Sequence, residues 1–405
     1  MALQPIFRRL KLRLFTVLPF GQGDNLKLSI PMKFVVQALG LTGGGGKELA
    51  ISLFSRLTSY KRHRFIFLVP DLPEYRCLGG SNSKVIVWQK PAGLWARDFQ
   101  LNHTLNAVCA KWDCNALLCM ANFAPRKPAC NTVLLLQNAY LAYREPAAER
   151  HLTMRERLTV AYGRRAYRRL SPRVRLVAQT EVMKQRLLAS YGFGPRRVEV
   201  IPNSCSFPRS SAPRHPPHSK RPFVFLCLGW YYVHKNLEIL PQALRRLRTY
   251  TSRPVECRIT ISPDQHPRAR RFLRELEREN MAGVIINIGP VQRSELARIY
   301  DSSDALLLPT LLESFSRTYL EAMHFGLPIL TSDRDFARHI CQDAALYFDP
   351  LDADSVARSV ASIMEDGALR TSLAQNGKRL ISKSPTWDEI AEQFVSVLEE
   401  AAGVP

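Results

Sequence analysis

Residues 306–330 constrain the fold of this chain more than any other stretch. They read LLLPTLLESFSRTYLEAMHFGLPIL and follow an alanine. The apolar run at the start has the length of a buried parallel strand and stops at a proline. A loop bearing Glu313 follows, and Ser316 is a candidate N-cap for a helix that we expect to end at Gly326. The stretch therefore predicts a strand, a loop and a helix in succession.

Two carboxylates frame the expected junction between loop and helix. Glu313 stands before the helix and Glu321 inside it, eight residues apart. With a helix that starts after Ser316, Glu321 sits about 7 Å along the axis, at roughly 1.5 Å per residue. The first backbone amides of such a helix form an anion site. A diphosphate bound there would leave a ribose near Glu321 and a sugar near Glu313, which indicates a nucleotide-sugar site; two solvated glutamates are the alternative.

This stretch resembles the retaining glycosyltransferases of family 4. The resemblance rests on two glutamates separated by seven residues, with SFS after the first and AMHFGLP after the second. It is strong over residues 223–400 and diffuse over 32–203. It implies an α/β chain with the GT-B fold: two Rossmann-like domains, an interdomain cleft and a C-terminal crossover helix. It also implies that Glu313 is catalytic and that Glu321 binds the donor, together with the residues between them: Ser314, Phe315, Ser316, Arg317 and Thr318.

A second segment of the C-terminal half carries the same resemblance. A strand expected at Phe223–Leu228 ends in a glycine, followed by WYYVHKN. Relatives often have an arginine directly after the glycine and a lysine a few residues on, both at the donor diphosphate. Lys235 matches the lysine and is assigned a catalytic role, whereas Trp230 stands where the arginine would be. A solvated helix start is the alternative for Lys235. Gly289 and Pro290, after another expected strand, would meet the nucleobase.

The N-terminal half opens with an expected strand at Met32–Leu39, the loop GLTGGGG and a helix from about Lys47 to Thr58. Glycines let backbone amides approach a phosphate without interference from side chains. Neither a G-x-G-x-x-G nor a Walker A pattern is present, so a flexible surface loop is the alternative. The resemblance places Gly43 and Gly44 of this loop at the donor phosphates.

Gln137 and Asn138 end another expected strand, in VLLLQNAYLA. Many relatives carry a histidine at a comparable strand end. Gln137 and Asn138 stand there in this chain, so no general base is assigned to this segment. Amides can hydrogen-bond sugar hydroxyls, and we expect these two residues to bind the acceptor. A simple strand-end turn is the alternative.

Apolar runs of strand length alternate with helical patterns through both halves, which is typical of parallel sheets wrapped by helices. We expect a basic arm at residues 1–30, an acceptor domain at 31–203, a Pro-rich linker at 204–222, a nucleotide-sugar domain at 223–384 and the crossover helix at 385–405. One long helix is expected over Glu145–Leu170, with Met154, Leu158, Ala161 and Tyr162 toward the core.

The basic excess of the chain lies entirely in its first part. The first 220 residues hold 35 Lys and Arg against 11 Asp and Glu, and the remainder holds 22 against 24. Such a field attracts nucleic acid, acidic lipid headgroups or a phosphate-bearing substrate. Eight arginines crowd residues 155–175 and would face water or an anionic bilayer. The acidic residues of an expected helix at Arg268–Glu279 argue against nucleic acid as a partner.

The nine cysteines include no C-x-x-C pair. Several lie in apolar runs, where cysteine packs as a small hydrophobe. We therefore expect no metal and no disulfide, in a reducing cytoplasm. No run approaches the roughly 20 apolar residues that span a bilayer. The N-terminal arm has no signal-peptide pattern and is expected to be a floppy basic arm or, alternatively, a short interfacial anchor.

The resulting expectation is a metal-independent retaining glycosyltransferase without a cofactor. Its substrates would be a GDP- or UDP-sugar, with a mannosyl donor as the guess, and a lipid-linked or polysaccharide acceptor for cell-surface glycan synthesis. It would work peripherally on the cytoplasmic face of an anionic membrane. The alternatives are a nucleotide-sugar epimerase on the same fold, or a non-catalytic protein that binds nucleic acid or anionic membranes.

Overall fold

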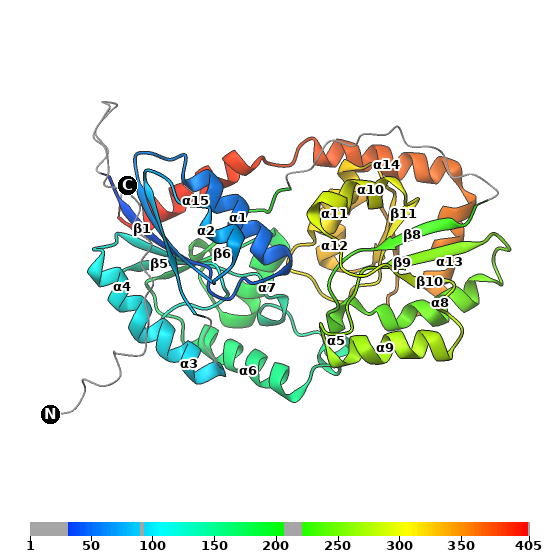
Figure 1. Ribbon diagram of the computed structural model, residues 1–405, viewed down its shortest axis with the longest axis horizontal. Helices are drawn as coiled ribbons and strands as arrows, with labels where there is room; N and C mark the ends of the chain where they lie inside the picture. Colours follow the sequence, from blue (N-terminus) through cyan, green and yellow to red (C-terminus); the bar gives the residue numbers. More distant parts are fainter. Residues whose placement is uncertain (1–30, 90–92, 206–220, 404–405) are drawn as a thin grey trace. The chain divides into compact units, whose positions relative to one another are not determined.

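The computed structural model describes residues 31–89, 93–205 and 221–403, which form two compact units (Figure 1). The first unit holds the described residues up to Asn138, with Ala161–Pro202 and the residues from Trp387 onward. The second unit holds Ala139–Val160 and the described part of Asn203–Thr386. The expected arm at 1–30 and residues 206–220 of the expected linker lie outside the described residues. Residues 139–160, which we had placed in the first domain, group with the second unit.

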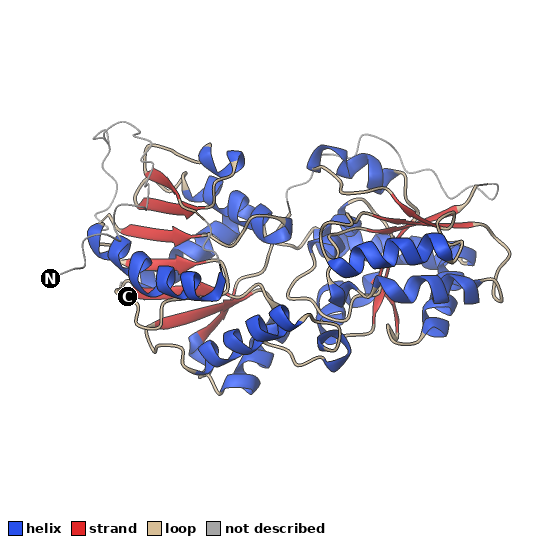
Figure 2. Ribbon diagram, turned by 60° about the horizontal axis from the view of Figure 1, so that its bottom comes forward, coloured by secondary structure: helices blue, strands red, loops and turns tan. Residues whose placement is uncertain are grey.

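The first unit is built on a seven-stranded parallel sheet in the order β3-β2-β1-β4-β5-β6-β7. The central strands are buried along their length, because helices cover the sheet and solvent reaches neither face (Figure 2). The strands are β1 (Lys33–Gln37), β2 (Arg64–Val69), β3 (Ser83–Val87), β4 (Ala116–Cys119), β5 (Asn131–Leu135), β6 (Val174–Ala178) and β7 (Val198–Val200).

The second unit is built on a six-stranded parallel sheet in the order β10-β9-β8-β11-β12-β13. Its strands are β8 (Phe223–Cys227), β9 (Val255–Ile259), β10 (Ile285–Asn287), β11 (Ala305–Leu308), β12 (Ile329–Ser332) and β13 (Ala345–Phe348). Strand β12 continues through Thr331 to Ser332. Its Thr331 side chain is buried and donates to the Leu308 carbonyl oxygen of β11 at 3.1 Å.

Helices connect the strands of each sheet. Those of the first unit include α1 (Gly44–Leu57), α2 (Pro73–Arg76), α3 (Gly93–Phe99), α4 (Leu105–Lys111), α7 (Glu181–Tyr191) and α15 (Trp387–Ala401). The second unit contains α5 (Pro146–Glu149), α8 (Leu240–Leu247), α9 (Pro267–Arg278), α10 (Leu296–Asp301), α11 (Arg317–His324), α12 (Asp335–Cys341), α13 (Ala353–Glu365) and α14 (Gly367–Ile381). Helix α6 (Met154–Arg168) runs from the second unit into the first.

The last helix, α15, belongs to the core of the first unit although the preceding 180 or so residues belong largely to the second. Its buried Trp387, Ile390 and Phe394 lie in one apolar cluster with residues of β1 and α1. Asn131 at the start of β5 donates to the Ala401 carbonyl oxygen at 2.7 Å. The chain therefore returns to its first sheet at the end, as the crossover expectation requires.

The long helix expected over 145–170 is interrupted, because a second helix start lies within it. Thr153 and Glu156 form a capping box: the Thr153 amide donates to Glu156 Oε2 at 2.8 Å and the Glu156 amide to Thr153 Oγ1 at 3.3 Å. This pair begins α6, separately from α5. The T-x-x-E signal was visible in the sequence and was overlooked.

The core-facing side of α6 also differs from the expected one. Val160, Gly163 and Tyr167 are buried, whereas Met154 is 72% and Leu158 57% exposed. Ala161 is exposed as well. The exposed apolar side chains alternate with arginines along α6, so the helix presents a mixed apolar and basic face to solvent.

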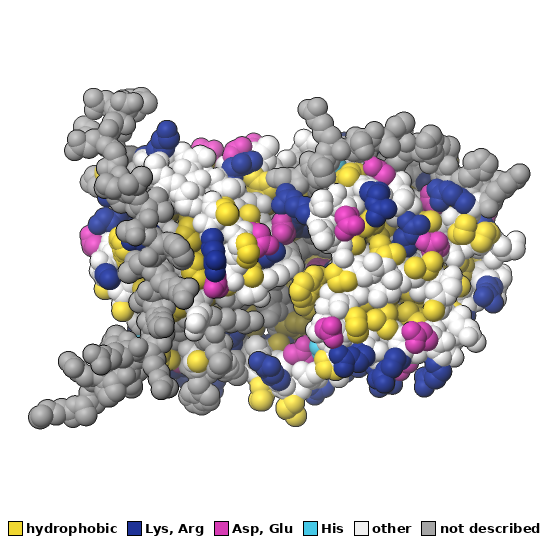
Figure 3. All heavy atoms as spheres, viewed as in Figure 1, with side chains coloured by type: hydrophobic (Ala, Val, Ile, Leu, Met, Phe, Trp, Pro, Cys, Tyr) yellow, Lys and Arg dark blue, Asp and Glu magenta, His cyan; other side chains and the backbone are white. Residues whose placement is uncertain are grey.

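Helix α9 has the solvated outer face that its charge pattern predicts. Phe272 and Leu276 are buried, and Arg271 and Glu275 form an ion pair at helical spacing with an Nε–Oε1 distance of 2.7 Å. Figure 3 shows Lys and Arg side chains interspersed with Asp and Glu over this part of the surface. Within the described ranges, no helix combines the length and apolar character needed to cross a membrane.

Candidate active site

The carboxyl edge of the second sheet brings the two expected catalytic residues, Lys235 and Glu313, to one place. Strands β8 and β11 are neighbours, and from them the strand order runs outward in opposite directions, through β9 to β10 and through β12 to β13. Such a reversal opens a crevice beyond the strand ends, where open α/β sheets bind their ligands. The loop after β8 carries Lys235 and the loop after β11 carries Glu313.

Lys235 and Glu313 form an ion pair at this reversal. The Lys235 Nζ atom lies 2.5 Å from Glu313 Oε1, and the two side chains are only 14% and 11% exposed. Thr310 adds a hydroxyl donor to the same carboxylate oxygen at 3.3 Å. Gly229 adopts a φ of +145°, which favours glycine, and turns the chain at the end of β8 beneath the Lys235 side chain. A half-buried ammonium and carboxylate therefore stand where a sugar diphosphate could bind.

His234 is a site residue that the sequence analysis did not single out. Its ring stacks on Tyr232 at a centroid distance of 5.3 Å and meets the edge of Tyr140 at 5.6 Å. Its backbone carbonyl accepts from the Leu311 amide at 2.7 Å, which ties the loop after β8 to the loop after β11. Burial lowers the pKa of His234 to about 4, although the Glu313 charge acts in the opposite direction. The imidazole is therefore neutral at pH 7.

Helix α11 begins and ends where the sequence predicts. Ser316 occupies the N-cap position, although its side chain makes no capping hydrogen bond. At the other end Gly326 has a φ of +66°, its amide donates to the Met323 carbonyl and the Leu327 amide donates to the Ala322 carbonyl at 2.8 Å. These two hydrogen bonds are a Schellman motif, which explains why the helix stops at the glycine.

Glu321 is held inside α11 by two partners. Its Oε2 atom accepts from the Tyr300 hydroxyl at 2.8 Å, and its Oε1 atom lies 3.6 Å from Arg317 Nη2, one turn earlier. Burial, followed by the Glu321 charge, raises the pKa of Tyr300 well above its usual value, so this hydroxyl stays a donor. The Glu321 side chain is only 9% exposed. Glu321 is thus a hydrogen-bond acceptor whose side chain is held in place by partners on two helices.

The other expected donor residues of the second unit lie in the same loop or at the same sheet edge. Ser314 and Phe315 are half-buried between Glu313 and α11, and Thr318 is half-buried in its first turn. Gly289, with a φ of +74°, and the exposed Pro290 follow β10, two strands from β8. They share the carboxyl edge with Lys235, but β9 stands between their strand and β8.

In the first unit, the glycine loop and Gln137 lie against each other. The loop leads from β1 into α1, which starts at Gly44 rather than at the expected Lys47. A Cβ atom at Gly46 would come within 2.9 Å of Gln137 Oε1, so only glycine lets the two approach this closely. The Gln137 side chain donates to the Met120 carbonyl oxygen at 2.7 Å. Gly43, the N-cap of α1, and Gly44, with a φ of +62°, precede this contact.

Asn122 positions both of the expected acceptor residues and was also missed. Its Oδ1 atom accepts from the Gln137 amide at 2.6 Å and from the Asn138 amide at 2.7 Å. Asn122 has a φ of +65°, a conformation that asparagine tolerates better than most residues. This asparagine lies after β4, the strand that neighbours β1 where the strand order of the first sheet reverses. An Asn-Phe after an apolar run was the only available signal.

The fold has clear counterparts among solved structures. Sucrose-phosphate synthase from Thermosynechococcus elongatus matches 91% of this chain and 98% of its own, with a TM-score of 0.72 at 15% identity. HepE of Anabaena in complex with UDP and glucose matches 91% of this chain and 100% of its own, with a TM-score of 0.66 at 16% identity. Both likenesses support the fold alone.

Sequence comparisons point to one family. O-antigen chain mannosyltransferase B of Escherichia coli is 22% identical over 232 residues, which cover 55% of this chain and 59% of that protein. The chain spans 30–59% of the length of the first curated relatives it matches. The family model described as "Glycosyl transferases group 1" matches residues 209–380, which include the loop after β8 and all of α11. The chain has the GT-B fold, and its residues 209–380 are similar to the glycosyl transferases group 1 family.

Proposed function

We propose that the protein is a retaining glycosyltransferase that moves a sugar from a nucleoside diphosphate sugar to a lipid-linked or polysaccharide acceptor. The observation that carries this proposal is the Lys235–Glu313 pair at the strand-order reversal of the second sheet. Glu313 lies in the loop that leads into α11. An ammonium, a row of helix-start amides and two fixed carboxylates are the groups that a sugar diphosphate needs.

The donor phosphates would lie on the first amides of α11, with Lys235 next to them. Positive charge at this point stabilises the diphosphate as it leaves, which is the form of catalysis that a preorganised site supplies best. We propose that Lys235 and the helix offset this charge without a metal ion. Glu321 would accept hydrogen bonds from the ribose hydroxyls and Glu313 from the sugar. Gly289 and Pro290 would contact the nucleobase.

The identity of the donor is supported by the comparisons only at the level of class. The E. coli relative is named a mannosyltransferase, and the Anabaena structure is a complex with UDP and glucose. We propose a GDP- or UDP-sugar, with mannose as the first sugar to test, and cell-surface glycan synthesis as the setting.

We propose that transfer proceeds by front-face attack, as the resemblance to retaining glycosyltransferases implies. The bond between C1 of the sugar and the phosphate oxygen breaks, and a bond from the acceptor oxygen to C1 forms on the same face. The acceptor proton passes to the departing phosphate oxygen. Glu313 is paired with Lys235, an arrangement that suits electrostatic support better than nucleophilic attack. In the first unit, Gly43 and Gly44 would approach the donor phosphates, and Gln137 and Asn138 would hydrogen-bond acceptor hydroxyls.

We further propose that the acceptor is reached at the cytoplasmic face of an anionic membrane. The support is the outer face of α6, where exposed Met154 and Leu158 alternate with the exposed Arg155 and Arg157. Apolar side chains beside arginines suit an interface of headgroups and acyl chains.

The decisive experiment is a transfer assay with a panel of nucleoside diphosphate sugars and extracted lipid-linked acceptors. The proposal predicts transfer that needs the acceptor and keeps the anomeric configuration of the donor, measured by NMR of the product. Conversion of the donor to another nucleotide sugar without acceptor would instead identify an epimerase. Transfer with inversion would contradict the assigned mechanism.

A further inference from the structure

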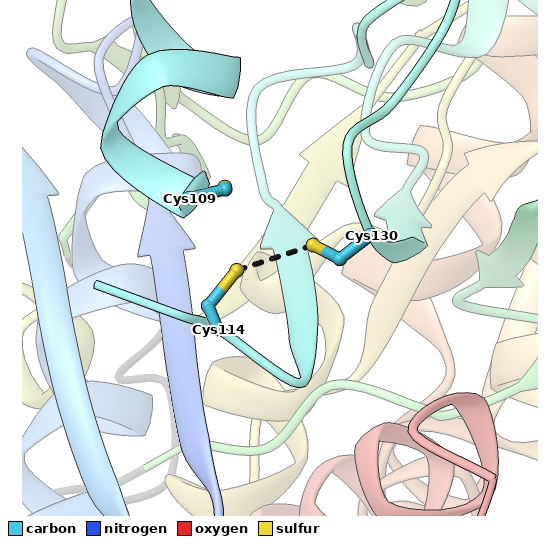
Figure 4. Close-up of side chains that lie close together, drawn as sticks. All are labelled: Cys109, Cys114 and Cys130. Atoms are coloured by element: carbon cyan, nitrogen blue, oxygen red, sulfur yellow. Dashed lines mark hydrogen bonds between the residues drawn. The ribbon is translucent and has the colours of Figure 1, made fainter. Parts of the chain in front are cut away.

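Three cysteines that are far from any C-x-x-C pattern meet at the amino-terminal edge of the first sheet. Cys109 lies near the end of α4, Cys114 in the turn that leads to β4, and Cys130 directly before β5 (Figure 4). Because Ala116 of β4 pairs in register with Asn131 of β5, the chain segments before the two strands are adjacent. The sulfur atoms all lie within 4.8 Å of one another.

The backbone holds this arrangement independently of the sulfur atoms. The Cys114 amide donates to the Cys109 carbonyl oxygen at 3.0 Å, across a turn in which Asp113 has a φ of +49°. On the other side, the Thr132 hydroxyl donates to the Cys130 carbonyl oxygen at 3.1 Å. Figure 4 shows the side chains of Cys114 and Cys130 pointing toward each other, and their sulfur atoms are 3.2 Å apart.

We propose that Cys109, Cys114 and Cys130 form a three-thiolate site for a thiophilic metal ion, with Zn²⁺ as the ion that fits best. Thiolates select Zn²⁺ and Cu⁺ among biological metals. Thiolates that bind zinc at about 2.3 Å in tetrahedral geometry lie roughly 3.8 Å apart, which falls between the 3.2 Å of the closest pair and the 4.8 Å limit for all three. Water would complete the tetrahedron, because Cys114 and Cys130 are only half-buried.

Charge balance favours zinc over copper at this site. Three thiolates with Zn²⁺ leave one net negative charge, and with Cu⁺ they leave two. Binding would release the thiol protons of the three cysteines to solvent as the three sulfur–metal bonds form.

A disulfide between Cys114 and Cys130 is the competing outcome, and the third sulfur argues against it. A disulfide joins two sulfur atoms and would leave the thiol of Cys109, which is buried, directed at the bond. A metal ion uses all three. The cluster lies at the edge of the sheet opposite to Gly43 and Gln137, which follow the carboxyl ends of β1 and β5. The proposed role is therefore structural: the ion would join α4 to two strands.

The test is elemental analysis of the full-length protein, purified under reducing conditions without chelator and incubated with Zn²⁺ before desalting. About one zinc per chain is expected in the wild type and in Cys77→Ser, which changes an exposed cysteine outside the cluster. Cys130→Ser should lose the ion. Copper in place of zinc in the protein as purified, with the same dependence on Cys130, would assign the same site to Cu⁺.

A second measurement keeps the test valid if Cys130→Ser does not fold. Wild-type protein reconstituted with Co²⁺ should show intense thiolate-to-cobalt charge-transfer absorption, and chelation should lower its Tm. Wild type that binds no metal, equal metal content in a folded Cys130→Ser, or a Cys114–Cys130 disulfide found by mass spectrometry after alkylation would each overturn the proposal.

Discussion

The Lys235 ammonium lies 2.5 Å from a carboxylate oxygen of Glu313, although 78 residues separate the two in the chain. Neither side chain is more than 14% exposed. The two strands that precede them are neighbours in the sheet, so the topology of the second unit creates the pair. A charged pair at this edge is of limited value for stability, because desolvation offsets much of the attraction. Its position at the strand-order reversal is what favours a role in binding a phosphate-bearing ligand.

Lys235→Ala and Glu313→Gln should each lower kcat by about 10²–10³-fold, the usual effect of removing one preorganised electrostatic group. Because the two side chains act as one unit, the double variant should lose less than the product of the single effects. Steady-state kinetics of the four proteins measures this. Strictly multiplicative losses, or near-wild-type rates in both single variants, would refute the assignment.

Gly45 and Gly46 provide a matched pair of substitutions in the glycine loop. Alanine at Gly45 meets no atom within 4 Å, whereas alanine at Gly46 would lie 2.9 Å from Gln137 Oε1 and 3.0 Å from Leu41 Cδ2. Gly45→Ala should stabilise the protein by about 0.5–1 kcal/mol through helix propensity. Gly46→Ala should lose that gain and raise the acceptor KM, because Gln137 must leave the Met120 carbonyl.

Urea unfolding and acceptor kinetics test the pair. Equal stabilisation by both substitutions, with unchanged acceptor KM, would show that Gln137 is not held by the loop and has no part in binding the acceptor.

His234 should make the protein sensitive to acid. Its pKa in the folded state is about 4, below the ordinary value of about 6.5, because burial disfavours the charged ring. Between these values the unfolded chain binds the proton more tightly, so stability falls as pH drops from about 6.5 to 4, by at most about 1.4 kcal/mol per pH unit. His234→Gln should flatten this part of the curve, and the exposed His339→Gln should not. Denaturant unfolding at a series of pH values provides the measurement. If the free energy of unfolding depends on pH identically in all three proteins, His234 is not the source of the acid sensitivity.

The outer face of α6 should bind anionic vesicles. Wild-type protein should sediment with vesicles that contain anionic lipid, less at high salt because ions screen the arginines. Met154→Ser with Leu158→Ser should weaken binding without loss of Tm, since both side chains are exposed. Leu351→Ser, at another exposed apolar position, is the matched control. Phe272→Ser and Leu276→Ser would be unsuitable, because both residues are buried. Indifference to lipid charge would contradict the membrane proposal.

The sequence predicted the local elements better than their mutual placement. Strand β11, the cap at Ser316 and the stop at Gly326 follow from residues next to one another, and the structure agrees with them. The capping box of Thr153 and Glu156 that starts α6 was also a local signal. It was missed because the residues on both sides of it have a helical pattern. Once the helix was taken as continuous, its apolar residues were assigned to the core, and Met154 and Leu158 proved to be exposed.

Contacts between distant segments were beyond the sequence analysis. The ion pair of Lys235 with Glu313 and the hydrogen bond from Tyr300 to Glu321 depend on which strands and helices are neighbours. Asn122 was missed because its role requires a left-handed backbone beside the end of β5. The three converging cysteines are separated by four and fifteen residues. They match no compact metal-binding motif, so the sequence did not predict that they meet.

Stabilisation of the protein by nucleoside diphosphate sugars tests the central claim most directly. A bound donor at 100 times its Kd adds about 2.7 kcal/mol to the free energy of unfolding. We predict this increase for one member of a donor panel in the wild type and in Glu277→Gln, a change at an exposed position of α9. Glu321→Gln should lose most of it, because a hydrogen bond to a charged group contributes about 1.5–3 kcal/mol. If no donor stabilises the wild type, or if Glu321→Gln responds as the wild type does, the nucleotide-sugar site proposed at α11 is contradicted.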